Sequence, residues 1–208
     1  MPQKLNLATW NRKEHFQFFR RFEEPFFGVC VEVDCTQAYQ RTKELDISFF
    51  LYYLHKSLVA VNQTEPFRYR IEGDDVIVHE HIGASATINR PDGTFGFSYI
   101  AYAEDFWEFD QLAQAEIQRI RSTTGLEPAT SSEGVIHYSS LPWIKFTSVS
   151  HARSFSHADS IPKISFGKMT TVNDKQMMPV SVHVHHALMD GFHVSQHLEL
   201  FQKLLNQS

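Results

Sequence analysis

Apolar side chains recur every three or four residues in three long stretches of the chain. Such a pattern gathers them on one side of a helix that faces a core. It predicts helices over residues 47–62, over residues 106–121 and after Gly191. Residues 10–22 mix charged side chains with four phenylalanines, which indicates a further helix that ends before Pro25.

Shorter runs that are rich in valine or alternate in polarity predict β-strands. They lie at residues 27–34, 67–71, 76–78, 84–89, 95–102, 135–138, 163–172 and 177–186. Turn sequences at residues 73–75, 91–93 and 173–174 join consecutive runs and predict hairpins. This mixture predicts an α/β (α+β) fold in which a mixed β-sheet is covered by helices.

The length of 208 residues fits one large domain or two small ones. The two candidate linkers, residues 123–132 and 151–160, are short enough to be loops inside a domain. A chain of this size buries roughly 70% of the surface it exposes when unfolded, so it needs no disulfide or structural metal. We therefore expect residues 1–208 to form a single domain.

Charge and hydropathy argue against several classes of partner. The net charge is -5 with neutral histidines, and no cluster of Lys and Arg marks a nucleic-acid surface. The first six residues lack the apolar segment of a secretory signal, and the longest apolar stretch, residues 47–61, is interrupted by polar residues. Cys30 and Cys35 are five residues apart beside a predicted strand and point to opposite faces, which disfavours a disulfide. We expect a cytoplasmic protein with no membrane partner.

The segment HHALMDG, residues 185–191, joins the last predicted strand to the last predicted helix. Alternation along the strand puts His186 on the side of Val184, and His185 on the side of Ser181 and His183. An apolar environment disfavours the charged imidazole, so a histidine there remains a base at neutral pH. His186 is therefore the candidate general base.

Three other interpretations of this segment stay open. The chain has 12 histidines, so a chance pair is not surprising. Two histidines on one strand face could chelate zinc, and the metal-ligand set would be His183, His185, Asp190 and His193, although its spacing matches no established motif. Asp190 and Gly191 also suit the start of a helix for purely structural reasons.

The sequence closely resembles the chloramphenicol acetyltransferases. The matching segments are WNRKEHF at residues 10–16, FRYR at 67–70, SSLPWIKFTS at 139–148, MPVSV at 178–182 and HHALMDGFHV at 185–194. The short H-x-x-x-D-G core alone is less specific, because acyltransferase domains of 2-oxo acid dehydrogenase complexes share it. The match along nearly the whole chain favours the smaller, stand-alone enzyme.

The resemblance implies a CoA-dependent acyltransferase-like two-layer sandwich that forms a homotrimer with its active sites between subunits. It implies acetyl-CoA as cosubstrate, a small hydroxylated acceptor and no metal. His186 is then the general base and Ser139 the hydrogen-bond donor to the oxyanion. Asp190 is expected to pair with Arg12 and hold the loop, and Ser165 stands where the family has a threonine that assists through water.

By the same resemblance, Trp143 and Lys168 match positions on the CoA side, and Phe19 and Phe95 match the acceptor pocket. Phe19 stands where many members have tyrosine, and residues 22–28 and 94–99 also differ from the family. His183 replaces a common glutamine. These positions shape the acceptor site, so two alternatives to acetylation of chloramphenicol remain: another hydroxylated acceptor, or a ligand-binding homologue without catalysis.

Overall fold

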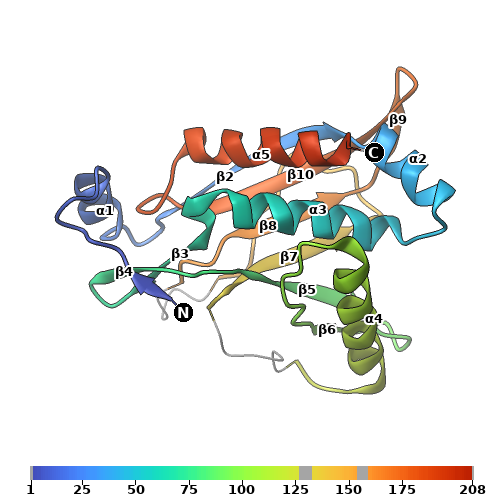
Figure 1. Cartoon of the computed structure of the whole chain (residues 1–208), viewed down its shortest axis with the longest axis horizontal. Helices are drawn as coiled ribbons and strands as arrows, with labels where there is room; N and C mark the ends of the chain where they lie inside the picture. Colours follow the sequence, from blue (N-terminus) through green and yellow to red (C-terminus); the bar gives the residue numbers. More distant parts are fainter. Residues whose placement is uncertain (1, 127–132, 154–158, 208) are drawn as a thin grey trace.

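A mixed β-sheet forms the middle of the molecule (Figure 1). The structure is a computed structural model that describes residues 2–126, 133–153 and 159–207. Within those residues the main sheet has seven strands. Six lie in the spatial order β2 (Phe26–Asp34), β10 (Lys175–His185), β8 (Lys163–Gly167), β7 (Val135–Leu141), β5 (Gly83–Asn89) and β6 (Phe95–Phe97), and β9 (Thr170–Val172) pairs with β10 beside this path.

The middle strands β5, β7 and β8 are parallel, whereas β10, β2 and β6 are antiparallel to their neighbours. A second, small sheet consists of β1 (Gln3–Lys4), β4 (Asp75–Val78) and β3 (Tyr69–Glu72). The 3-10 helix η1 (Glu65–Arg68) leads into β3. The expected mixed sheet is therefore confirmed.

Two long helices, α3 (Phe49–Gln63) and α5 (Gly191–Leu205), lie side by side over one face of the main sheet (Figure 1). The valines of β10 that alternate toward this face are fully buried, and so are the apolar residues of both helices that cover them. These residues are Val180, Val182, Val184, Leu54, Leu58, Phe201 and Leu205. Burial of this apolar area is the main contribution to stability.

Each of these helices starts at a polar cap that satisfies a free backbone N–H group. Ser48 accepts a hydrogen bond from the N–H of Leu51 at the start of α3. Asp105 does the same for the first turn of α4 (Phe106–Ser122), and Asp190 for that of α5. The caps explain why these helices begin close to where the apolar spacing predicts.

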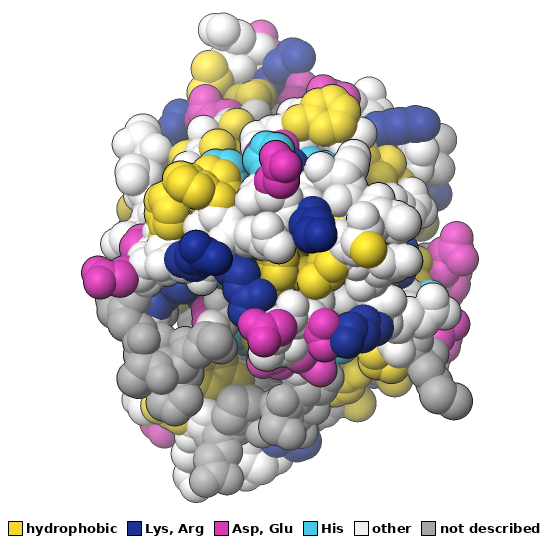
Figure 2. All heavy atoms as spheres, turned by 90° about the vertical axis from the view of Figure 1, so that its left-hand side faces the viewer, with side chains coloured by type: hydrophobic (Ala, Val, Ile, Leu, Met, Phe, Trp, Pro, Cys, Tyr) yellow, Lys and Arg dark blue, Asp and Glu magenta, His cyan; other side chains and the backbone are white. Residues whose placement is uncertain are grey.

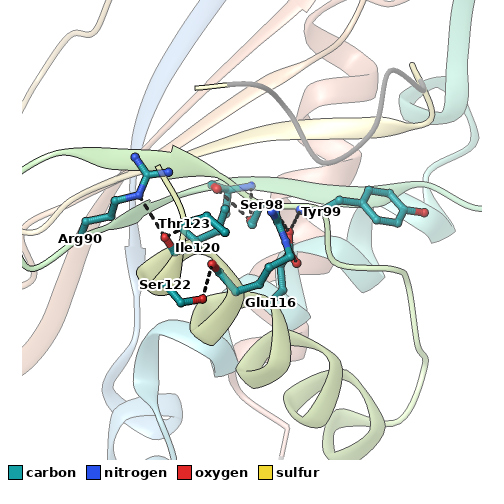
Figure 3. A network of polar contacts seen from close by, with 9 residues as sticks. Arg90, Ser98, Tyr99, Glu116, Ile120, Ser122 and Thr123 are labelled. Carbon is teal, nitrogen blue, oxygen red and sulfur yellow. Dashed lines mark hydrogen bonds and ion pairs between the residues drawn. The ribbon is translucent and has the colours of Figure 1, made fainter. Parts of the chain in front are cut away.

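A set of polar contacts fixes α4 to the β5–β6 hairpin (Figure 3). The Nε of Arg90 donates to the carbonyl of Ile120 at 3.0 Å. Its Nη1 donates to the carbonyl of Phe95 at 2.8 Å. The carboxylate of Glu116 accepts from the N–H of Tyr99 at 2.7 Å. The position of β6 at the sheet edge is therefore tied to the helix behind it.

The elements differ from the predictions in several places. The strand expected over residues 67–71 is divided between η1 and β3. The helix expected over residues 10–22 is the shorter α1 (Lys13–Phe19), and α2 (Thr36–Glu44) was not predicted. The run 163–172 is divided into β8 and β9, since β10 pairs with each separately. Residues 95–102 form only β6 and one isolated bridge, between Ala84 and Ile100.

Parts of the two candidate linkers, residues 127–132 and 154–158, lie outside the described residues. The expectation of one domain over residues 1–208 stays a prediction. Cys30 and Cys35 are both free, as expected. Among the residues that the structure describes, no helix has the length and apolar character needed to cross a membrane.

Candidate active site

The chain turns sharply where β10 ends. The N–H of Leu188 donates to the carbonyl of His185 at 3.0 Å, which closes a turn that begins at His186. The N–H of His186 donates to the carbonyl of Pro25 at 2.8 Å, just before β2. His186 is therefore held by its backbone between the end of one strand and the start of its neighbour.

Two phenylalanine rings enclose the imidazole of His186. Phe19, the last residue of α1, stacks on it with ring centroids 4.0 Å apart and an interplanar angle of 12°. Phe27 lies 4.7 Å away at 48°. Phe27 is the register partner of Val184, so His186 lies on the valine side of the strand, where alternation predicted it.

The tautomer of His186 follows from one contact that the sequence does not reveal. Its Nδ1 lies 3.3 Å from the carbonyl oxygen of Met189. A carbonyl oxygen can only accept, so this contact favours a proton on Nδ1. The lone pair is then on Nε2, the nitrogen that does not face the turn.

Asp190 links this turn to two helices. Its Oδ2 lies 2.5 Å from Nη1 of Arg12, whose side chain is 11% exposed, and its Oδ1 accepts from the N–H of Phe192 at 3.0 Å. The Nδ1 of His193 lies 2.9 Å from the same Oδ1. Burial alone would raise the pKa of Asp190, but the hydrogen bond and charge of Arg12 outweigh it and lower the pKa. Asp190 is therefore an anion that anchors the turn.

The proposed metal ligands point to different neighbours. His185 is buried against the ring of Phe26, accepts from the N–H of Ala187 at 3.2 Å, and has its pKa lowered to about 4 by burial. The Nδ1 of His183 lies 3.0 Å from the Oγ of Ser181. No group of three or more His, Cys, Asp or Glu residues within the described part of the chain is placed to hold a metal ion. The hypothesis of zinc bound by these residues therefore has no geometric support.

Ser139 lies on the sheet face opposite to α3 and α5, in a line of hydroxyl groups that we call the hydroxyl row: Ser139, Ser165 and Ser181. Ser139 on β7 pairs with Ser165 on β8, which pairs with Ser181 on β10. Ser165 is fully buried, and its Oγ has no hydrogen-bond partner among the described residues. A buried hydroxyl without a partner is unusual and suits a bound water.

The register separates Ser139 from His186. Two strand spacings lie between Ser139 and Ser181, and β10 runs four more residues from Ser181 to His185. With about 4.8 Å between strands and about 3.3 Å per residue, Ser139 is roughly 16 Å from His185, and His186 lies one residue farther along the chain. One chain does not bring the two predicted catalytic side chains together.

A cavity of about 730 Å³, here called the face cavity, lies over Ser139 on the same face of the sheet. Phe95 on β6 forms part of its wall and is 41% exposed. The other lining residues come from strands β5 to β8 and adjoining loops: Ser85, Thr87, Phe97, Ser98, Glu133, Val135, His137, Tyr138, His151, Ala152, Ile161 and Lys163. The cavity thus combines aromatic rings with many polar groups.

A second cavity, of about 500 Å³, lies at the carboxyl ends of the parallel strands β5, β7 and β8, here called the strand-end cavity. Its wall includes Ser140, Lys168 and Tyr53 of α3, whose hydroxyl is 3.0 Å from the Oγ of Ser140. Ser139 and Ser140 are consecutive on β7 but line different cavities. The strand therefore forms a wall between two spaces, as carboxyl ends of parallel strands often do at ligand sites.

The four predicted binding residues lie in three places. Lys168 is exposed at the strand-end cavity, and Trp143 is 65% exposed in the segment that follows β7. Phe95 lines the face cavity, whereas Phe19 packs on His186. The two phenylalanines assigned to one acceptor pocket are thus apart within this chain.

The sequence did not reveal the polar wall of the face cavity. His137, His151 and Lys163 belong to no motif and lie on different segments. They meet only because β7 and β8 are paired and the chain after β7 returns over the same sheet face, where the rings of His151 and His183 are 4.8 Å apart. Tyr53 lies inside the helix predicted over residues 47–62, and no motif marks it as a site residue.

The helix-covered mixed sheet with a histidine turn after β10 is the fold of the CoA-dependent acyltransferases. A solved structure of dihydrolipoamide acetyltransferase from Azotobacter vinelandii has the same fold. Its TM-score is 0.68 at 17% identity, covering 93% of this chain and 86% of that one.

Within this class the chain belongs to the chloramphenicol acetyltransferase family, whose model matches residues 2–202. It is 30% identical to chloramphenicol acetyltransferase 3 of Escherichia coli, over 98% of this chain and 96% of the relative. A Proteus mirabilis chloramphenicol acetyltransferase is 26% identical over 98% of this chain and 94% of its own length. A solved chloramphenicol acetyltransferase structure has a TM-score of 0.91 at 31% identity, with 99% of this chain and 100% of that chain covered.

Proposed function

We propose that this protein transfers an acetyl group from acetyl-CoA to a hydroxyl of chloramphenicol. The observation that carries the proposal is the state of His186. Its ring is held between Phe19 and Phe27, and its Nδ1 contact with Met189 favours a free lone pair on Nε2. An imidazole held in one orientation with a free lone pair is the group that can take the proton of a hydroxyl.

In the proposed reaction, Nε2 of His186 takes the proton of the acceptor hydroxyl as its oxygen attacks the thioester carbonyl. The tetrahedral intermediate carries its negative charge on the former carbonyl oxygen, to which the hydroxyl of Ser139 donates a hydrogen bond. The C–S bond then breaks, and the CoA sulfur receives the proton from His186. One donor aimed at such an oxyanion lowers the barrier by about 3–4 kcal/mol.

The reaction needs His186 and Ser139 at one acetyl group, although more than about 15 Å separates them within a chain. We therefore propose a homotrimer in which His186 and Phe19 of one subunit meet Ser139 and Phe95 of the next. The face cavity supports this arrangement, because Ser139 lies in an open wall rather than in a closed pocket. The Arg12–Asp190 ion pair keeps the His186 turn in shape.

The strand-end cavity is the proposed entry for acetyl-CoA. The exposed ammonium of Lys168 suits the phosphates of CoA, and Trp143 offers an exposed ring close to the same strand end. Ser139 and Ser140 would then separate the acceptor from the CoA chain, with the thioester at their boundary. Ser165 would hold a water beside the oxyanion. The chemistry needs no metal.

Another hydroxylated acceptor is the second candidate function. Phe19 lacks the hydroxyl that a tyrosine would offer to a substrate, and the face cavity has a polar wall. Both features concern the acceptor and leave the acyl transfer unchanged. The remaining expectations, a single domain over residues 1–208 and a cytoplasmic location, are part of the same proposal.

Release of CoA thiol on adding chloramphenicol to the protein and acetyl-CoA tests the function. His186→Ala should lower kcat by about a hundredfold to ten thousandfold, since a general base contributes that factor. His81→Ala, at an exposed histidine outside both cavities, is the matched control. Release with a different hydroxylated antibiotic alone would support the second candidate, and tight binding without release would indicate a homologue that only binds.

A further inference from the structure

A second line of side chains lies beside the hydroxyl row, one residue pair away on the same sheet face. His137 on β7 pairs with Lys163 on β8, and Lys163 pairs with His183 on β10. We call these three residues the basic row. Because strand neighbours on one face are two residues apart, the basic row lies roughly 7 Å from the hydroxyl row.

Two members of the basic row are already engaged. The ammonium of Lys163 donates to Oδ2 of Asp159 at 2.5 Å and to the carbonyl of Ile161 at 3.1 Å, and its side chain is only 8% exposed. The Nδ1 of His183 contacts the Oγ of Ser181, and its ring fills the space over Gly28, where any Cβ would overlap it. Neither side chain is free to receive a ligand.

His137 differs from both. It lines the face cavity, its side chain is exposed, and no described residue makes a hydrogen bond to its imidazole. It lies two residues before Ser139 on the same strand face, so the two side chains reach the same space roughly 7 Å apart. A neutral imidazole offers one N–H donor and one nitrogen acceptor there.

The charges around His137 favour an uncharged ligand group. The nearest cation, Lys163, is already neutralised by Asp159. Glu133 also lines the cavity, and one of its carboxylate oxygens is buried without a hydrogen-bond partner among the described residues. The buried guanidinium of Arg70 offsets the charge of Glu133. Each charge around His137 thus has an opposite charge nearby, so neither an anionic nor a cationic group would find an uncompensated partner here.

Aromatic surface completes the wall. The rings of Phe95 and Phe97 on β6 meet edge to face with centroids 5.6 Å apart, and both line the cavity. Phe97 pairs with Thr87, which lies two residues after Ser85, the register partner of His137. An acceptor in this cavity can place an aromatic ring on β6 while its polar end meets β7.

We propose that His137 determines acceptor specificity by hydrogen bonding to an uncharged polar group that lies roughly 7 Å from the hydroxyl reacting at Ser139. This inference rests on the proposed function. It names the acceptor class as amphipathic aromatic alcohols that carry such a group. His137 takes no part in the proton transfer, which belongs to His186.

The test compares acceptors that differ in one substituent: chloramphenicol, its analogue with a sulfone in place of the nitro group, and its analogue with hydrogen there. His137→Phe should raise the KM of the nitro and sulfone compounds about threefold to tenfold, since one neutral hydrogen bond accounts for that factor. Its kcat and its KM for acetyl-CoA should not change. His137→Gln, which keeps a hydrogen-bonding group, should keep the wild-type KM.

The analogue without the polar group is the internal control, and its KM should be the same in wild type and His137→Phe. If the KM of each acceptor is the same in His137→Phe as in wild type, this inference is wrong, but the proposed acetyl transfer is unaffected. A wild-type protein that acetylates none of the three would instead overturn the proposed function. Circular dichroism of each variant separates a loss of binding from a loss of fold.

Discussion

The ring of Phe19 lies flat on the imidazole of His186, with centroids 4.0 Å apart and planes within 12°. One residue belongs to α1 and the other to the turn after β10, so the contact joins two distant parts of the chain. A stacked ring limits rotation of the imidazole about its Cβ–Cγ bond. Together with the Met189 carbonyl, it leaves one orientation for Nε2.

Phe19→Ala should lower kcat about threefold to tenfold, because an aromatic pair stabilises its geometry by about 0.5–1.5 kcal/mol beyond burial. The KM for acetyl-CoA should stay near its wild-type value. Phe19→Tyr keeps the ring and should keep kcat within about twofold. Steady-state kinetics with both variants decide the matter, and equal kcat values for Phe19→Ala and wild type would contradict a role for the stack.

Arg12 and Asp190 should be coupled in stability. Their ion pair is partly buried, so Arg12→Ala leaves the carboxylate of Asp190 without its main partner. Asp190→Ala also removes the cap of α5, which alone accounts for about 1 kcal/mol. We expect a coupling energy of about 1–3 kcal/mol in a double-mutant cycle measured by urea unfolding.

The control for that cycle is the exposed ion pair between Arg20 and Asp74, whose Asp74 side chain is 96% exposed. Its coupling should be below about 1 kcal/mol. Additive effects of Arg12→Ala and Asp190→Ala would show that the pair does not act as a unit. The kcat should fall in both single variants, since the turn that carries His186 loses its anchor.

The sequence predicted α3 and α5 well because their apolar spacing, their caps and their burial agree. It missed α2, in which only Ala38 and Thr42 are buried, so no apolar stripe marks the segment. The site residues also fall into two groups, those that the sequence revealed and those that it did not. His186 and the Arg12–Asp190 pair belong to motifs, whereas the basic row joins residues of β7, β8 and β10 whose pairing depends on the order of strands in the sheet.

Acid should destabilise the protein through its buried histidines. Burial lowers the pKa of His55 and His185 to about 4, and that of His197 to about 3. A histidine in the unfolded chain has a pKa near 6.5. Below that pH the unfolded state therefore binds protons that the folded state does not bind. The contribution of neutral histidines to stability is complete above about pH 6.5 and is lost as the pH falls toward 4.

Each of these histidines should lower the free energy of unfolding by about 1.4 kcal/mol per pH unit across that window. Urea unfolding between pH 7.5 and 5 measures the slope. His185→Gln removes one titrating group, so the slope should decrease by the contribution of a single histidine. A free energy of unfolding that stays constant from pH 7 to pH 5 would refute the assignment of these imidazoles as neutral core groups.

The division of the active site between subunits has a decisive test in mixed trimers. Ser139→Ala should lower kcat by about a hundredfold to a thousandfold, and His186→Ala should be at least as severe, so neither parent trimer has appreciable activity. When the two variants are co-expressed, an interface between the intact His186 of one subunit and the intact Ser139 of the next restores a complete site.

With equal and random mixing, about three quarters of the trimers contain both variants, and each of those has one complete site in three. The mixture should therefore recover about a quarter of the wild-type activity. A site built from one chain gives no recovery, because every subunit lacks either its histidine or its serine. Within one chain these two residues are more than about 15 Å apart. If the enzyme is active, its sites must therefore lie between subunits, and the mixture should recover activity.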